Sequence, residues 1–125
     1  MQFKNILLVF VGGGMGSVVR YGIASVFSGK FEGRPWVATL LINLIACLLL
    51  GYYLESAWNR QAGALTMRLL IATGFCGGLS TFSTFAFETW FLFRAGQVGT
   101  AFFNLALSMV LGLLAIGFGV ILAKA

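Results

Sequence analysis

Histidine and aspartate are absent from this sequence, and charged residues of any kind are scarce. Of 125 residues, 8 are lysine or arginine and 3 are glutamate. The absence of histidine excludes imidazole metal sites, Ser-His-Asp triads and histidine proton relays. Charged residues make up 9% of the chain, whereas an ordinary soluble domain has roughly 25%. So few charges cannot coat a globule of this size, so a free-standing soluble protein is excluded.

Cysteine and clustered basic residues are also too sparse to suggest a site. Cys47 and Cys76 lie inside apolar stretches without CxxC spacing, so we expect reduced packing residues rather than a disulfide or metal pair. The formal net charge is +5, but the basic residues are scattered singly between apolar runs. This pattern argues against nucleic acid as a partner. The sequence shows neither a nucleophile–base pair nor a metal-ligand cluster, so we predict that the protein is not an enzyme.

What the chain does have is long apolar runs. Hydrophobic residues make up 60% of it, and a membrane-spanning helix needs about 20 of them in succession. Four stretches are long enough, joined by short connections. We therefore predict an all-α, multi-pass membrane protein, with one four-helix transmembrane domain over residues 1–125. The expected helices cover approximately 4–28, 36–58, 66–94 and 98–123.

The distribution of lysine and arginine gives almost no orientation signal. One side of the membrane would hold Lys4, Arg60, Arg68 and Lys124. The other side would hold Lys30, Arg34 and Arg94, with Arg20 added if its side chain snorkels that way. This near balance favours insertion in both orientations, and two oppositely inserted copies can then pair as an antiparallel dimer. The alternative is a single orientation that is set by residues outside this count.

The third apolar stretch, residues 73–88, is unusual for a membrane helix. Three glycines, Gly74, Gly77 and Gly78, weaken the helix by roughly 1 kcal/mol each. Four hydroxyl residues follow within five positions: Ser80, Thr81, Ser83 and Thr84. Hydroxyls can bond backbone groups that a helix break sets free, and such breaks occur where backbone is buried in protein or lines a cavity. We predict a helix broken at membrane depth; the alternative is a kinked helix whose hydroxyls bond its own carbonyls.

Aromatic rings accompany these hydroxyls. Phe82 and Phe85 are three residues apart and share a helix face. Their electropositive ring edges, placed beside hydroxyl donors, can solvate a small anion that has shed water; ordinary aromatic packing is the alternative. Gly12 and Gly16 form a GxxxG pair, which serves packing within one subunit or between two.

A few further polar residues lie within the apolar stretches. Asn43, with Thr39 one turn earlier, can face a pore or cross-link helices. Ser108 is the clearest polar residue deep within the fourth span, and Asn104 lies one turn earlier. Arg20 is costly in hydrocarbon and should face protein or a water-filled vestibule. Glu88 can pair with Arg20, cap the break or couple transport to protons.

Three blocks of this sequence resemble the fluoride channel family called Fluc or CrcB. They are Gly12-Gly-Gly-Met-Gly-Ser-Val-Val-Arg-Tyr21, Thr39-Leu-Leu-Ile-Asn-Leu44 and Thr73-Gly-Phe-Cys-Gly-Gly-Leu-Ser-Thr-Phe-Ser-Thr-Phe85 with Glu88. The resemblance implies an antiparallel, dual-topology homodimer with two pores. It also implies passive, selective export of fluoride from the cytoplasm across the cell inner membrane, which lowers fluoride toxicity.

The same resemblance implies roles for individual residues. Asn43 matches the family's pore asparagine, and Phe82 and Phe85 match its pore phenylalanines. The implied fluoride pathway also includes the hydroxyls of Thr39, Thr81, Ser83, Thr84 and Ser108. A structural Na⁺ at the dimer centre would be held by the backbone carbonyls of Gly77 and Ser80. Asn104 departs from the family pattern in the fourth helix, as Ala46 does near Asn43.

Two rival functions are compatible with the composition. A small dual-topology, proton-coupled cation exporter also has four spans, but it needs an embedded acid, for which Glu88 is the candidate. A non-transporting membrane scaffold explains the glycines and leaves the hydroxyl-rich break unexplained.

Overall fold

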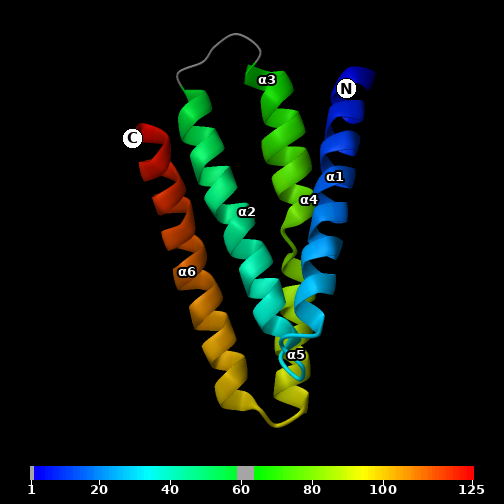
Figure 1. The fold of residues 1–125 in the computed structure, drawn as a ribbon, viewed down its shortest axis with the longest axis vertical. Helices are drawn as coiled ribbons and strands as arrows, with labels where there is room; N and C mark the ends of the chain where they lie inside the picture. Colours follow the sequence, from blue (N-terminus) through cyan, green and yellow to red (C-terminus); the bar gives the residue numbers. More distant parts are fainter. Residues whose placement is uncertain (1, 59–63) are drawn as a thin grey trace.

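The protein is a bundle of four long helical spans, seen in a computed structural model that describes residues 2–58 and 64–125 (Figure 1). The first two spans are α1 (Phe3–Ser28) and α2 (Pro35–Trp58). The third is built from α3 (Ala64–Met67), η1 (Arg68–Cys76), α4 (Gly77–Leu79) and α5 (Phe82–Arg94), and the fourth is α6 (Val98–Lys124). The described residues contain no strand. All four spans are long and apolar enough to cross a membrane, so this is a multi-pass membrane protein.

Short turns connect the spans at one end of the bundle, opposite both termini (Figure 1). Gly33 and Gly96 have φ angles of 77° and 76°, a left-handed conformation that glycine adopts without strain. Each reverses the chain within a few residues, and Pro35 begins α2 at the position where its missing N–H costs nothing. Arg60, which the sequence assigned to the terminal end of the bundle, lies outside the described residues.

Glycines bring α1 into backbone contact with the third span. A methyl group on Gly12 would lie 2.1 Å from the carbonyl oxygen of Leu70, and one on Gly16 would lie 2.2 Å from that of Phe75. From the other side, a methyl on Gly78 would lie 2.3 Å from the carbonyl oxygen of Gly13. The GxxxG pair therefore packs within one chain, as small residues do where membrane helices approach closely.

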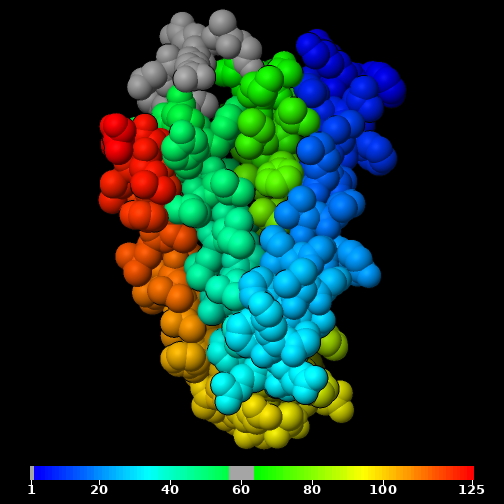
Figure 2. Space-filling model, viewed as in Figure 1, coloured from blue at the N-terminus to red at the C-terminus, as the bar shows by residue number. Residues whose placement is uncertain are grey.

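A second glycine contact joins α2 to α6. A methyl on Gly51 would lie 2.3 Å from the carbonyl oxygen of Ile116, and one on Gly119 would lie 2.2 Å from that of Leu48. Figure 2 shows α6 along one edge of the molecule beside α2. The outer face of α6 exposes large apolar side chains such as Phe102, Leu113 and Phe118, which suits contact with lipid. Close backbone contact, rather than a large core of bulky side chains, holds the bundle together.

The third span is interrupted, as the sequence predicts, but the glycines are not where it breaks. Gly77 and Gly78 are helical, and the extended residues are Ser80 (φ −74°, ψ 156°) and Thr81 (φ −149°, ψ 110°). Gly74 and Gly78 serve contact with α1 instead. Before the break, η1 is a nine-residue π-helix. This geometry is rare in proteins overall, but where it occurs it is often near a functional site. Nothing in the sequence pattern predicted it.

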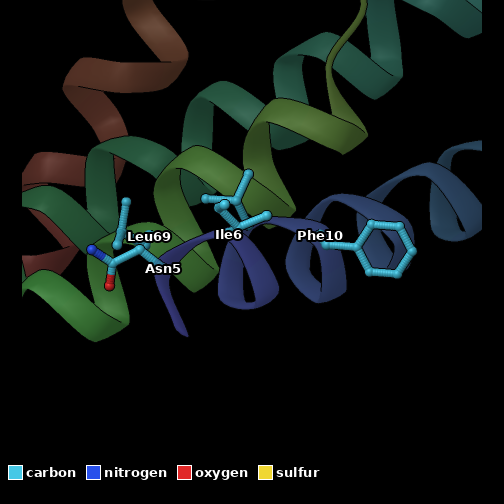
Figure 3. A pocket seen from close by; sticks show the side chains of 5 residues that line it. Asn5, Ile6, Phe10 and Leu69 are labelled. Carbon is cyan, nitrogen blue, oxygen red and sulfur yellow. The ribbon is translucent and has the colours of Figure 1, made fainter. Parts of the chain in front are cut away.

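An apolar recess of about 590 Å³ lies between α1 and η1 near the N-terminus (Figure 3). Its lining is Asn5, Ile6, Val9, Phe10 and Leu69. Among the described residues that line it, Asn5 alone has a polar side chain, so this recess offers an ion few hydrogen-bonding groups. The polar groups of the spans gather instead around the break.

Candidate functional site

The centre of the candidate site is a two-point contact between Asn43 of α2 and the backbone of Thr81. The N–H of Thr81 donates to Asn43 Oδ1 at 2.8 Å, and Asn43 Nδ2 donates to the carbonyl oxygen of Thr81 at 3.2 Å. A broken helix leaves backbone groups that must find partners inside a membrane. Of the two roles left open for Asn43, the structure shows the cross-link, and the amide keeps one further N–H.

Thr81 also organises the hydroxyls of α5. Its Oγ1 accepts the backbone N–H of Thr84 at 3.2 Å, which caps the helix in the usual way for a threonine at this position. The same Oγ1 donates to Thr84 Oγ1 at 3.0 Å and lies 3.4 Å from Ser83 Oγ. Thr81 is buried, whereas Ser83 and Thr84 are exposed on the chain's surface. Three hydroxyls thus form one cluster that opens outward at the start of α5.

The part of the third span before the break, which consists of α3, η1 and α4 and is called the upper half here, ends in carbonyls that accept hydrogen bonds from α1. Ser17 Oγ donates to the Gly78 carbonyl, and Arg20 Nη1 donates to the Ser80 carbonyl, each at 3.5 Å. A cation is favourable at a helix C-terminus because the carbonyls there carry partial negative charge. Arg20 is half-buried, so it faces protein, one of the two environments expected for it.

Glu88 does not pair with Arg20, contrary to one expectation from the sequence. Its Oε1 accepts from Thr39 Oγ1 at 2.9 Å, and its Oε2 is buried without a partner among the described residues. Arg20 instead donates to the carbonyl of Ser80 at the break, eight residues before Glu88 in the sequence. Glu88, Thr39 and Thr84 line a recess of about 430 Å³, which residues at the end of α1 and in the α1–α2 connection also line.

The rings of Phe82 and Phe85 lie next to the hydroxyl cluster. Their centroids are 5.8 Å apart and the ring planes are inclined by 51°. Phe82 is 79% exposed and Phe85 is half-buried. The pair therefore sits at the surface of a single chain, with the open side of Phe82 facing away from the bundle.

A separate polar chain runs from α6 to α5. Ser108 Oγ donates to Asn104 Oδ1 at 3.2 Å, and Asn104 Nδ2 donates to Thr89 Oγ1 at 3.1 Å. Thr89 Oγ1 in turn donates to the carbonyl oxygen of Phe85 at 2.8 Å. Sequence reasoning did not identify Thr89. Its spacing of four residues from Phe85 was the available signal, because it places the two on one helix face.

The predicted site residues thus fall into three hydrogen-bonded groups. One group surrounds the break and contains Asn43, Thr81, Ser83 and Thr84, with Ser80 tied to Arg20 beside it. A second joins Thr39 to Glu88, and the third holds Ser108. Gly77 is exposed, and among the described residues no cluster of three or more His, Cys, Asp or Glu side chains could ligate a metal.

Comparison with known proteins identifies the family of this chain. Residues 7–120 match the family described as "CrcB-like protein, Camphor Resistance (CrcB)". A "Fluoride-specific ion channel FluC" of Pyrococcus furiosus is 40% identical over 125 residues, covering 99% of each chain. One from Chlorobaculum tepidum is 41% identical over 124 residues, covering 99% of this chain and 98% of the relative. With a family match over most of its length and full-length relatives at this identity, the chain belongs to the CrcB family.

Proposed function

We propose that this protein is a fluoride-selective channel that lets fluoride leave the cytoplasm passively across the cell inner membrane. The observation that carries the proposal is the hydroxyl cluster of Thr81, Ser83 and Thr84, which opens outward at a helix break beside Phe82 and Phe85. Relatives that cover the whole chain are named fluoride-specific ion channels. The proposal needs no enzymatic activity.

The chemistry of fluoride suits such a surface. Fluoride is small and strongly hydrated, and it accepts hydrogen bonds well, so a pathway must replace its water with closely spaced donors. Conduction also requires that each site hold the ion weakly enough to release it. Neutral hydroxyls, the free N–H of Asn43 and the electropositive ring edges of Phe82 and Phe85 meet both needs. A buried lysine would bind the anion too tightly.

We assign the remaining residues by their place around this surface. Thr39 and Glu88 line the recess on the α5 side of the break, where fluoride would enter or leave the pathway. Ser108 is the pathway residue that α6 contributes. Arg20 is the positive charge held nearest to the break, and it attracts anions toward it.

The exposed polar face also supports an antiparallel, dual-topology homodimer. Ser83 and Thr84 are exposed at membrane depth, where contact with lipid leaves polar groups without partners. A second copy would cover them and close a pathway on each side of the dimer. The described basic residues divide almost evenly between the two ends of the bundle, so the charges allow both insertions.

A structural Na⁺ at the dimer centre fits the residues present. The carbonyls of Gly77 and Ser80 lie at the end of the upper half-helix, where the partial charge is negative, and Gly77 is exposed for contact with a partner. Oxygen ligands are what hard cations take. The ion would supply positive charge that holds two carbonyl ends together; Arg20 already contacts one of them.

The test is anion efflux from liposomes that contain the purified protein. Fluoride and chloride electrodes are read in parallel, and a potassium ionophore clamps the voltage. Rapid fluoride release with negligible chloride release is the expected result. Folded protein that releases no fluoride would overturn the proposal.

One observation favours a second candidate, the proton-coupled cation exporter. The unpartnered Oε2 of Glu88 is buried beside a recess, as an acid that exchanges protons would be. In that case, cation uptake driven by a pH gradient would replace the fluoride signal.

A further inference from the structure

In the polar chain between α6 and α5, which runs from Ser108 through Asn104 and Thr89 to the Phe85 carbonyl, each side chain donates to the next group. Both hydroxyl protons are therefore already used in hydrogen bonds. Ser108 donates to Asn104, Asn104 donates to Thr89, and Thr89 donates to the carbonyl of Phe85. A hydroxyl has one proton to give. Thr89 and Ser108 can therefore offer a proton to an anion only by releasing the bonds that they make here.

The two central residues of this polar chain are buried. Asn104 is 1% exposed and Thr89 is 4% exposed. A buried amide or hydroxyl is costly unless it is hydrogen-bonded, so these two residues favour one relative height and rotation of α6 against α5. Loss of either partner would leave the other unsatisfied.

The part of α5 that this contact fixes carries the two phenylalanines. Phe82, Phe85 and Thr89 are spaced by three and four residues, so they follow one another along one face of the helix. Side chains in a helix lean toward its N-terminus, so the side chain of Thr89 reaches back to the turn that carries Phe85. In this bond the Thr89 hydroxyl is a side-chain donor to the carbonyl four residues earlier, an arrangement that is known to bend a helix slightly.

We propose that Asn104 and Thr89 are positioning residues, which hold α5 against α6 so that the rings of Phe82 and Phe85 keep the inclination that selects fluoride. This inference rests on the proposed channel function. It assigns Asn104, a departure from the family pattern, to orienting the phenylalanine pair rather than to contact with the ion.

The experiment compares isosteric and conservative variants in the liposome assay, with the fluoride-to-chloride permeability ratio read from reversal potentials. Thr89→Val exchanges a hydroxyl for a methyl group, Thr89→Ser keeps the hydroxyl, and Asn104→Leu removes the amide at similar size. Thr100→Val is the matched control, because Thr100 is a partly exposed threonine of α6 whose side chain makes no hydrogen bond among the described residues.

Thr89→Val and Asn104→Leu should each lower fluoride efflux on the order of tenfold, because small misplacements of a working group are costly. Both should also lower the fluoride-to-chloride permeability ratio. Thr89→Ser should restore both values, and Thr100→Val should match the wild type. The double variant Thr89→Val/Asn104→Leu should lose less than the two single losses combined, since both substitutions remove the bond between Asn104 and Thr89, while each also removes one further bond.

Several outcomes would overturn the inference. One is wild-type efflux and selectivity in Thr89→Val and Asn104→Leu. Another is a Thr89→Ser variant as defective as Thr89→Val. A third is reduced yield of folded protein with unchanged selectivity in the folded fraction, which would show a purely structural role. A wild-type protein that releases no fluoride overturns the channel proposal and this inference together, whereas a conducting wild type with normal variants overturns this inference alone.

Discussion

Asn43 and Thr81 contact each other through both ends of the asparagine amide, so that one side chain takes the place of two backbone hydrogen bonds. The distances are 2.8 Å to Asn43 Oδ1 and 3.2 Å from Asn43 Nδ2. Thr81 is the N-cap residue of α5, directly before Phe82. The break in the third span is therefore held open by α2, and the hydroxyl cluster depends on a residue 38 positions away in the sequence.

The first prediction concerns this contact. Asn43→Leu keeps the side-chain size but leaves the N–H and carbonyl of Thr81 without partners, at a cost of about 1–3 kcal/mol for each group. We expect a lower thermal midpoint in detergent together with lost fluoride efflux. Asn43→Asp retains the acceptor for the Thr81 N–H and should be less destabilised than Asn43→Leu. Equal stability of wild type and Asn43→Leu would show that the cross-link is unimportant.

The second prediction concerns the phenylalanine pair. Phe82→Ile and Phe85→Ile remove the electropositive ring edges and leave apolar side chains in their place. Each variant should lower fluoride efflux well below the wild type, by at least about tenfold if each ring edge contributes about 1.4 kcal/mol to the rate-limiting step. Phe87→Ile is a suitable control, because Phe87 is also exposed on α5 but makes no ring contact with the pair. Unchanged efflux in both variants would contradict the assignment of the pathway.

The third prediction tests how the bundle packs. A methyl group on Gly16 would lie 2.2 Å from the Phe75 carbonyl oxygen and 2.8 Å from the Leu79 nitrogen. These are backbone atoms, so Gly16→Ala must force α1 away from the third span, at a cost of about 1–3 kcal/mol. Gly14 has nothing within 4 Å of such a methyl. Gly14→Ala should therefore be neutral or stabilising, because alanine favours a helix by up to about 1 kcal/mol.

Thermal unfolding in detergent, followed by circular dichroism, measures both variants. The midpoint of Gly16→Ala should fall and that of Gly14→Ala should not. If the two variants unfold together, α1 does not pack on the third span through Gly16 as described.

The fourth prediction separates the two candidate functions at Glu88. Glu88→Gln keeps the size and one acceptor for the hydroxyl of Thr39 but cannot exchange a proton. For a channel, voltage-driven fluoride efflux should continue without any need for a pH gradient, in the wild type and in Glu88→Gln. For a proton-coupled exporter, the variant would abolish cation flux. Efflux in opposed pH gradients at clamped voltage decides between them.

Parts of this protein follow from the sequence alone. The scarcity of charge and the four apolar stretches determine a four-span membrane protein, because hydrocarbon admits little else. Residues 73–88 predict an interrupted third span, since their glycines weaken the helix and their hydroxyls can bond the backbone groups that a break sets free. The three motif blocks identify the family. Each of these conclusions depends on residues that are neighbours in the chain.

The tertiary structure decided what depends on contacts between distant residues. The sequence predicted a break within residues 73–88 but not which residues leave the helix; the fold places Gly74 and Gly78 against α1, where only a hydrogen side chain fits. The break falls at Ser80 and Thr81 because Asn43 supplies partners for the freed backbone there. Glu88 bonds Thr39 rather than Arg20, and Thr89 meets Asn104, because helix rotation, which hydropathy does not encode, determines which polar groups face each other.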